Sequence, residues 1–170
     1  MHIDSEVFVI FRLFFISVWL VASLGDERLL FPDDREALEK TRPSKEARPL
    51  FVGSLDNLFH MRREIGTTLD EADGARRVRG EKKIEPLNAL ADLPNHAIVD
   101  RGRLIGLWEY DFEAKAIVHA LFNKEGKAPA GFTKALSSME AFVRDQLGDA
   151  RSFSLDSPES RGERIAALKQ

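Results

Sequence analysis

Apolar and polar residues follow two contrasting patterns along this chain. From Val7 to Leu24 the sequence is almost continuously apolar, and Arg12 is the only charged residue in that stretch. After Gly25 charged residues become frequent, and the apolar positions recur at the spacings of helices and strands. We therefore expect an apolar N-terminal segment, residues 1–25, followed by one separate domain over residues 26–170.

The apolar segment has two interpretations. Its length is at the short end of what spans a bilayer, which makes a membrane anchor the alternative interpretation. Arg12 opposes insertion, at a cost of about 2.5–3.5 kcal/mol at the centre of a membrane helix. Asp4 and Glu6 are unlike the basic start of a signal peptide. We favour an apolar N-terminal helix that neither spans a membrane nor belongs to the domain.

Residues 95–122 have the pattern of an antiparallel β-meander. Three runs rich in β-branched and aromatic residues are separated by short turns. In the middle run, strict alternation places Leu104 and Trp108 on one face and Ile105 and Leu107 on the other. Both faces are apolar, so we expect this strand to be central and covered on both sides.

Short helices are expected on either side of the meander. Gly148 is suited to the left-handed position after a helix, and Ser157 before a proline is suited to cap the last one. The expected helical segments are residues 34–41, a turn and helix within 54–65, residues 133–147, and a final helix after Ser157. The predicted fold class is α+β: an antiparallel β-meander or partial barrel flanked by short helices, with the apolar N-terminal helix in addition.

A basic run interrupts the domain at residues 70–85, a stretch without aromatic residues that we interpret as a loop or hairpin tip. Each Lys or Arg that neutralises a phosphate releases counterions, so such a tip is a candidate contact for a DNA backbone. The alternatives are a solvated loop and, for the arginines before the run, an ion pair with Asp56. The candidate DNA-binding residues are Arg62, Arg63, Arg76, Arg77, Arg79, Lys82 and Lys83.

Composition restricts the remaining chemistry. The 170 residues suit one domain, and 25 Lys and Arg against 28 Asp and Glu give a net charge of −3, without overall attraction to nucleic acid. The sequence has no cysteine, which excludes disulfides, thiolate zinc sites and iron–sulfur clusters. The histidines are scattered and form no HExxH motif, so we expect neither a metal nor another cofactor.

Two stretches resemble a known family. The residues that carry the likeness are Ser54 and Asp56 in SLDNLFHMRR, and Gly102, Arg103, Gly106 and Trp108 in LPNHAIVDRGRLIGLWEYD. These stretches resemble the C-terminal part of the bacterial winged-helix DNA-binding domain family, which includes the DNA glycosylases that unhook interstrand crosslinks. The resemblance extends over most of this chain but only over the last part of a family member.

The resemblance implies a cytoplasmic protein whose partner is duplex DNA, with a β-rich module that follows tandem winged helices in the family. In the glycosylases of the family, the resemblance implies a catalytic Gln-x-Gln or Gln-x-Asp pair. This sequence has only two glutamines, Gln146 and Gln170, and neither lies in such a motif. We therefore expect a DNA-binding protein, truncated with respect to the family and without catalytic activity. The alternatives are a glycosylase-related repair protein acting on alkylated or crosslinked DNA, and a membrane-tethered accessory module. Nothing in the sequence predicts an oligomeric state.

Overall fold

The computed structural model describes residues 19–20, 29–30, 32–42, 44–61, 64–80, 83–123, 127–153 and 156–170. The chain divides into two units, residues 1–43 and 44–170. In the first unit, strand β1 (Trp19–Leu20) pairs antiparallel with β2 (Leu29–Leu30), and helix α2 spans Pro32–Lys40.

Most of the expected N-terminal apolar helix, and the expected boundary after residue 25, lie outside the described residues. The two described residues of that segment, Trp19 and Leu20, are in a strand and not in a helix. Within the described ranges, no helix is long and apolar enough to cross a membrane.

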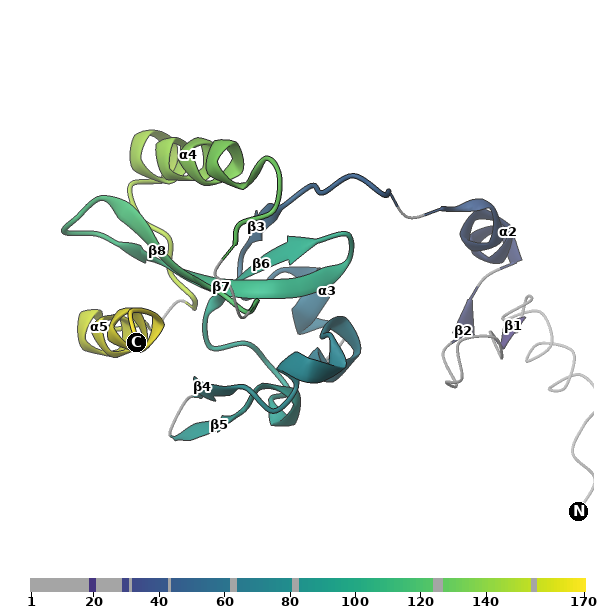
Figure 1. The fold of residues 1–170 in the computed structure, drawn as a ribbon, viewed down its shortest axis with the longest axis horizontal. Coiled ribbons are helices and arrows are strands. Elements are labelled where there is room, and N and C mark those ends of the chain that lie inside the picture. Colours follow the sequence, from purple (N-terminus) through teal and green to yellow (C-terminus); the bar gives the residue numbers. More distant parts are fainter. Residues whose placement is uncertain are drawn as a thin grey trace, which may run out of the picture. The chain divides into compact units, whose positions relative to one another are not determined.

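A four-stranded antiparallel sheet forms the centre of the second unit (Figure 1). Its order is β3 (Leu50–Val52), β6 (His96–Asp100), β7 (Arg103–Asp111) and β8 (Ala116–Leu121). The last three strands are consecutive, which confirms the predicted meander and the α+β class. The sheet is open, because its described strands run from edge β3 to edge β8 without closing into a barrel.

Helices and turns cover both faces of this sheet, as Figure 1 shows for α4 on one side and the small β4–β5 hairpin on the other. The sequence predicts a loop or a hairpin tip within the basic stretch of residues 70–85. The pairing of β4 with β5 confirms that a hairpin forms there. The elements are α3 (Asn57–His60), β4 (Arg77–Arg79), β5 (Ile84–Pro86), α4 (Phe132–Phe142) with a π-helical turn (Val143–Leu147), α5 (Pro158–Leu168), and 3-10 turns at Ile65–Thr68, Glu71–Asp73 and Leu87–Ala89.

The two helix-end signals in the sequence are confirmed. Gly148 follows the π-helical turn with a φ of 75°, and its N–H donates to the carbonyl of Val143 at 2.7 Å. Ser157 caps α5, since its hydroxyl oxygen accepts the N–H of Ser160 at 3.1 Å. Both signals depend on neighbouring residues alone, which is why the sequence is sufficient to predict them.

Two hydrophobic cores lie on the two faces of β7, as expected for a central strand. One core contains Phe59, Leu87 and Leu107, and the other contains Trp108 and Phe132. The latter core lies under α4, which contacts β3 and β8. Strand β7 therefore contributes side chains to both cores.

A β-bulge corrects the predicted faces of β7. Ile98 of β6 pairs with Gly106, but the next residue, Val99, pairs with Leu104, so Ile105 is an extra residue on β7. As a result Leu104 packs in the same core as Leu107, and Ile105 packs against the other core. The prediction that Leu104 shares a face with Trp108 was wrong, because the alternation rule assumes that the strand contains no inserted residue.

Gly106 is the residue that lets β8 lie close to this bulge. A Cβ at Gly106 would lie 2.5 Å from the carbonyl oxygen of Ala120 and 3.3 Å from the Cδ1 of Ile98. Any side chain would therefore displace the backbone of β8.

Replacing this glycine should destabilise the fold. We expect Gly106→Ala to lower the free energy of unfolding by about 3 kcal/mol, since the backbone of β8 has to shift. Urea denaturation of the purified chain measures the change. Gly53→Ala is the matched control, because nothing lies within 4 Å of a Cβ at Gly53. Equal stability of Gly106→Ala and wild type would contradict the close approach.

Candidate functional site

The cations of the basic run have different surroundings in the structure. Arg76 is bound into the fold: its Nη2 donates to the carbonyl of Phe122, its Nη2 lies 3.3 Å from Asp73 Oδ1, and its guanidinium lies 5.1 Å from the centre of the Phe122 ring. These contacts attach the start of the hairpin to the end of β8. Arg76 is therefore held by the fold through contacts to two residues, while its side chain stays 38% exposed.

Arg77, Arg79 and Lys83 lie on the accessible side of the same hairpin. Val78 packs against the core, so its strand neighbours Arg77 and Arg79 point the other way. Arg77 donates to the carbonyl of Ile84 at 3.0 Å. Lys82, Arg62 and Arg63, which the sequence also singled out, lie outside the described residues.

Two of these cations form ion pairs at the surface. The Nη2 of Arg79 binds a carboxylate oxygen of Glu163 on α5, and the Nζ of Lys83 lies 3.4 Å from Glu85 Oε2. The Lys83 side chain is 73% exposed. Surface pairs of this kind contribute about 0–1 kcal/mol, so an incoming anion can replace the carboxylate at little cost.

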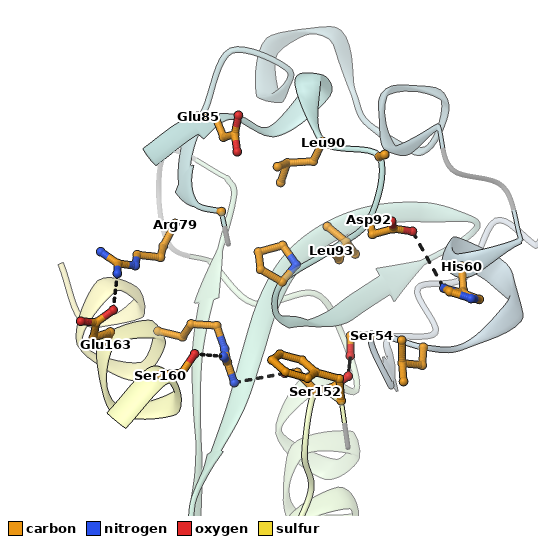
Figure 2. A pocket seen from close by; sticks show the side chains of 16 residues that line it. Ser54, His60, Arg79, Glu85, Leu90, Asp92, Leu93, Ser152, Ser160 and Glu163 are labelled. Carbon is orange, nitrogen blue, oxygen red and sulfur yellow. Dashed lines mark hydrogen bonds and ion pairs between the residues drawn. The ribbon is translucent and has the colours of Figure 1, made fainter. Parts of the chain in front are cut away.

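A hollow of about 450 Å³ lies beside the hairpin, between β4–β5 and the start of α5 (Figure 2). Leu90, Leu93 and Pro94 form an apolar part of its wall. Ser152, Ser160 and Arg164 line it on the side of α5. Arg79 and Glu163 flank one end of the hollow, and His60 and Asp92 flank the other.

Arg164 is the centre of a buried polar network behind this hollow. Its Nε donates to Glu109 Oε1 at 2.7 Å, and its Nη2 donates to Asp156 Oδ2 at 2.6 Å. Its Nη1 donates to the hydroxyl oxygen of Ser160 at 2.9 Å. Arg164 itself is only 4% exposed. The guanidinium is thus engaged by protein groups on all three of its nitrogens, which makes it a structural cation.

Glu109 is a fully buried carboxylate near the end of β7. Burial raises the pKa of Glu109, and the adjacent Arg164 guanidinium opposes that rise. Asn95 Nδ2 donates to the same carboxylate at 2.8 Å, and the Ser152 hydroxyl does so at 3.3 Å. The sequence reasoning missed this network, although one signal was available: a single carboxylate within the apolar run Leu107–Tyr110.

His96 is buried at the start of β6 and stacks on Trp108 with a distance of 4.3 Å between ring centroids. Its Nδ1 accepts the backbone N–H of Ser54 at 3.1 Å. Burial lowers the pKa of His96 to about 4, while the backbone of Ala150 acts in the opposite direction. At neutral pH the ring is therefore uncharged and a weak base.

The family-like residues Ser54, Asp56 and Trp108 serve the fold. The Ser54 hydroxyl donates to the carbonyl of Ser152 at 2.6 Å, and Asp56 Oδ1 accepts the N–H of Leu58 at 2.9 Å, which caps α3. The indole N–H of Trp108 donates to the carbonyl of Ala97 at 3.0 Å. Each of these groups is engaged in packing or capping.

The remaining family-like residues also have structural roles. Gly102 has a φ of 78° and, with Arg101 at 49°, forms the tight turn between β6 and β7. The Nη1 of Arg103 donates to the carbonyl of Leu69 at 2.9 Å. Gly106 accommodates the close approach of β8. The two family-like stretches both line the hollow beside the hairpin, one through Ser54, Leu55 and His60 and the other through Leu93 and Pro94. The residues that carry the likeness serve turns, caps and packing.

The arrangement of Ser54 and His96 lacks the geometry of a nucleophilic site. His96 Nδ1 bonds to the backbone of Ser54 and not to its hydroxyl, which instead donates to Ser152. His96 is buried, and although Ser54 lines the hollow beside the hairpin, its hydroxyl donates to a backbone carbonyl and not to a base. Over the described ranges, no group of three or more acidic or histidine side chains is placed to hold a metal ion. What the surface does offer is an accessible set of cations on the hairpin.

Loss of the Arg164 charge should strongly destabilise the chain. In Arg164→Met, Glu109 and Asp156 keep their buried positions without their main counter-charge, so we expect a loss of about 3–5 kcal/mol of unfolding free energy. Arg151→Met is the control: Arg151 contacts Asp149 at 3.1 Å with a side chain 59% exposed, and it should change stability by less than about 1 kcal/mol. Similar urea midpoints for both variants would contradict a stabilising role for the network.

Acid should destabilise the fold through His96. The unfolded chain takes up a proton near the ordinary pKa of 6.5, whereas folded His96 does so only near a pKa of about 4. Between these values the unfolded state binds more protons, so stability falls with decreasing pH, by roughly 3 kcal/mol in total. We expect His96→Asn, which retains an acceptor for Ser54, to have a flatter dependence of stability on pH. His60→Asn, at an exposed site, is the control, and an unchanged slope in His96→Asn would contradict the assignment.

No protein-family model, no curated protein and no solved structure matches this chain. The resemblance to the winged-helix DNA-binding family therefore rests on the residues in the two stretches alone. A function has to be inferred from the geometry of the chain itself.

Proposed function

We propose that this chain contacts the phosphate backbone of duplex DNA through the β4–β5 hairpin, as a non-catalytic member of the winged-helix DNA-binding family that its sequence resembles. One observation carries the proposal: the cations Arg77, Arg79 and Lys83 are gathered on the accessible side of one hairpin. A cluster of this kind matches a row of phosphates better than it matches a single small anion.

Exchange of ion-pair partners makes such binding possible. The Arg79 and Glu163 side chains are 34% and 59% exposed, so water already screens their attraction. A phosphate carries a full negative charge and releases bound counterions when it meets a cation, which favours the exchange. Arg77 donates to a neutral backbone carbonyl, and a charged phosphate oxygen is a stronger acceptor for the same guanidinium.

The same surroundings limit affinity and specificity. Glu85 and Glu163 lie beside the cations, and the chain carries a net charge of −3, so both oppose the approach of DNA. Phosphate contacts position a protein on a duplex without reading its bases. Binding should therefore be independent of sequence, with a dissociation constant in the range of about 1–100 μM at physiological salt.

The proposal is tested by fluorescence anisotropy with a short labelled duplex and the full chain over a series of salt concentrations. Three phosphate contacts predict a slope of log K against log salt of about −3. In the triple variant Arg77→Gln, Arg79→Gln, Lys83→Gln, the slope should become shallower by about one for each cation removed.

A matched variant controls for the change in net charge. Lys127, Lys134 and Arg144 are exposed cations outside the hairpin, and their replacement by Gln removes the same charge. This variant should retain most of the affinity. Equal reductions of affinity in the two triple variants, or no binding by wild type at low salt, would contradict the proposal.

A further inference from the structure

A second hollow follows the last turns of α5, where that helix passes the β4–β5 hairpin and the end of β8. It encloses about 490 Å³, within the range of about 300–1,000 Å³ that is usual for small-molecule sites. Figure 1 shows α5 beside β4 and β8, which supply much of the lining. Arg79 and Glu163 line this hollow as well as the first one, so their ion pair lies where the two meet. We call the second hollow the arginine groove.

Apolar side chains form most of the lining of the arginine groove. Leu107 and Phe122 are buried core residues, so the groove reaches down to the hydrophobic core. Val78, Leu121 and Leu168 line it and are only half-buried. The other apolar residues of the lining are Ile84, Ala120, Ala166 and Ala167. An alkyl chain in the groove would leave water and would cover this apolar surface, which favours binding by about 25 cal/mol per Å².

Guanidinium groups border the same apolar surface. Arg76, Arg77 and Arg79 line the arginine groove, and their opposing charges among the described residues are Asp73 beside Arg76 and Glu163 beside Arg79. The charge of Arg164, which also lines it, is balanced by buried carboxylates. The groove therefore carries an excess of positive charge, although the chain as a whole is acidic. That excess favours an anionic ligand.

Arg77 is the cation best placed to receive the anionic group. It is exposed, and its Nη2 donates to the neutral carbonyl of Ile84 at 3.0 Å, without a carboxylate partner among the described residues. A guanidinium donates two parallel N–H groups to a carboxylate or a phosphate, and such charge-assisted bonds are about twice as strong as neutral ones. An anionic head can therefore replace the carbonyl, while the chain attached to it extends over the apolar lining.

We propose that the arginine groove binds an anionic amphiphile with a single alkyl chain, its carboxylate or phosphate head on Arg77 and its chain along Val78, Leu121 and Leu168. The proposal does not rest on the DNA contact. It requires an anionic head and an alkyl chain in one molecule, and a nucleic acid has no alkyl chain.

Nuclear magnetic resonance titration of the ¹⁵N-labelled full chain tests the proposal with octanoate and octyl phosphate, which distinguish the two kinds of head. We expect saturable shifts, with at least one of them, at the amides of residues 76–79, 120–122 and 164–170. Decanoate should bind about tenfold more tightly than octanoate, because two more methylene groups leave water. The same chain with a neutral or cationic head, 1-octanol or octyltrimethylammonium, should bind at least about tenfold more weakly.

Two substitutions examine the head and the chain separately. Arg77→Gln should weaken binding of the anionic probe about fivefold or more, because one charge-assisted contact is lost. Arg144→Gln is the matched control, since it removes the same charge from a side chain that is 46% exposed and outside the groove. Ala167→Phe should also weaken binding, because its ring fills part of the groove. Ala141→Phe, the same change in α4, should bind like wild type.

Three results would overturn the proposal. One is the absence of saturable shifts with both anionic probes. Another is equal affinity for octanoate and octyltrimethylammonium, which would show that the guanidinium groups do not select the head. The third is equal affinity of Arg77→Gln and Arg144→Gln for the anionic probe. None of these titrations contains DNA, so their outcome is separate from that of the phosphate contact.

Discussion

The buried guanidinium of Arg164 is the constraint on which the arrangement of the second unit depends. Glu109 is fully buried near the end of the inner strand β7, where an unpaired carboxylate would be prohibitively costly. Its counter-charge comes from a residue 55 positions later, which fixes α5 against β7. The hollow beside the hairpin follows from that placement, because α5 supplies one of its walls. The partner of Arg79 follows as well, since Glu163 is the neighbour of Arg164.

Elements governed by local rules could be predicted from the sequence, and elements governed by distant contacts could not. The meander, the basic hairpin and the Ser157 cap depend on patterns within a few residues. The bulge at Ile105 depends on how β6 and β7 pair, so alternation within β7 alone placed Leu104 on the wrong face. The counter-charge of Glu109 could not be identified either, because no local pattern relates a strand carboxylate to one arginine of the final helix.

The candidate site shows the same limit. The sequence identifies the basic run as a group, but the structure separates Arg76 from the rest through Phe122, which lies 46 residues away. The proposed phosphate contact rests on the exposed cations, and the family-like glycines and Trp108 are explained by turns and packing. The hollow beside the hairpin became visible only in three dimensions, since its lining combines the β4–β5 hairpin, the loop before β6 and helix α5.

Native-state hydrogen exchange tests the central role of Arg164 most directly. If the network fastens α5 to the sheet, the amides of residues 164–168 should open together with those in the middle of β7, with the same free energy as global unfolding. Exchange from α5 at a much lower free energy, while β7 stays fully protected, would show that the helix frays independently. That result would contradict the account, because α5 would then give neither the hollow beside the hairpin a fixed wall nor Arg79 a fixed partner in Glu163.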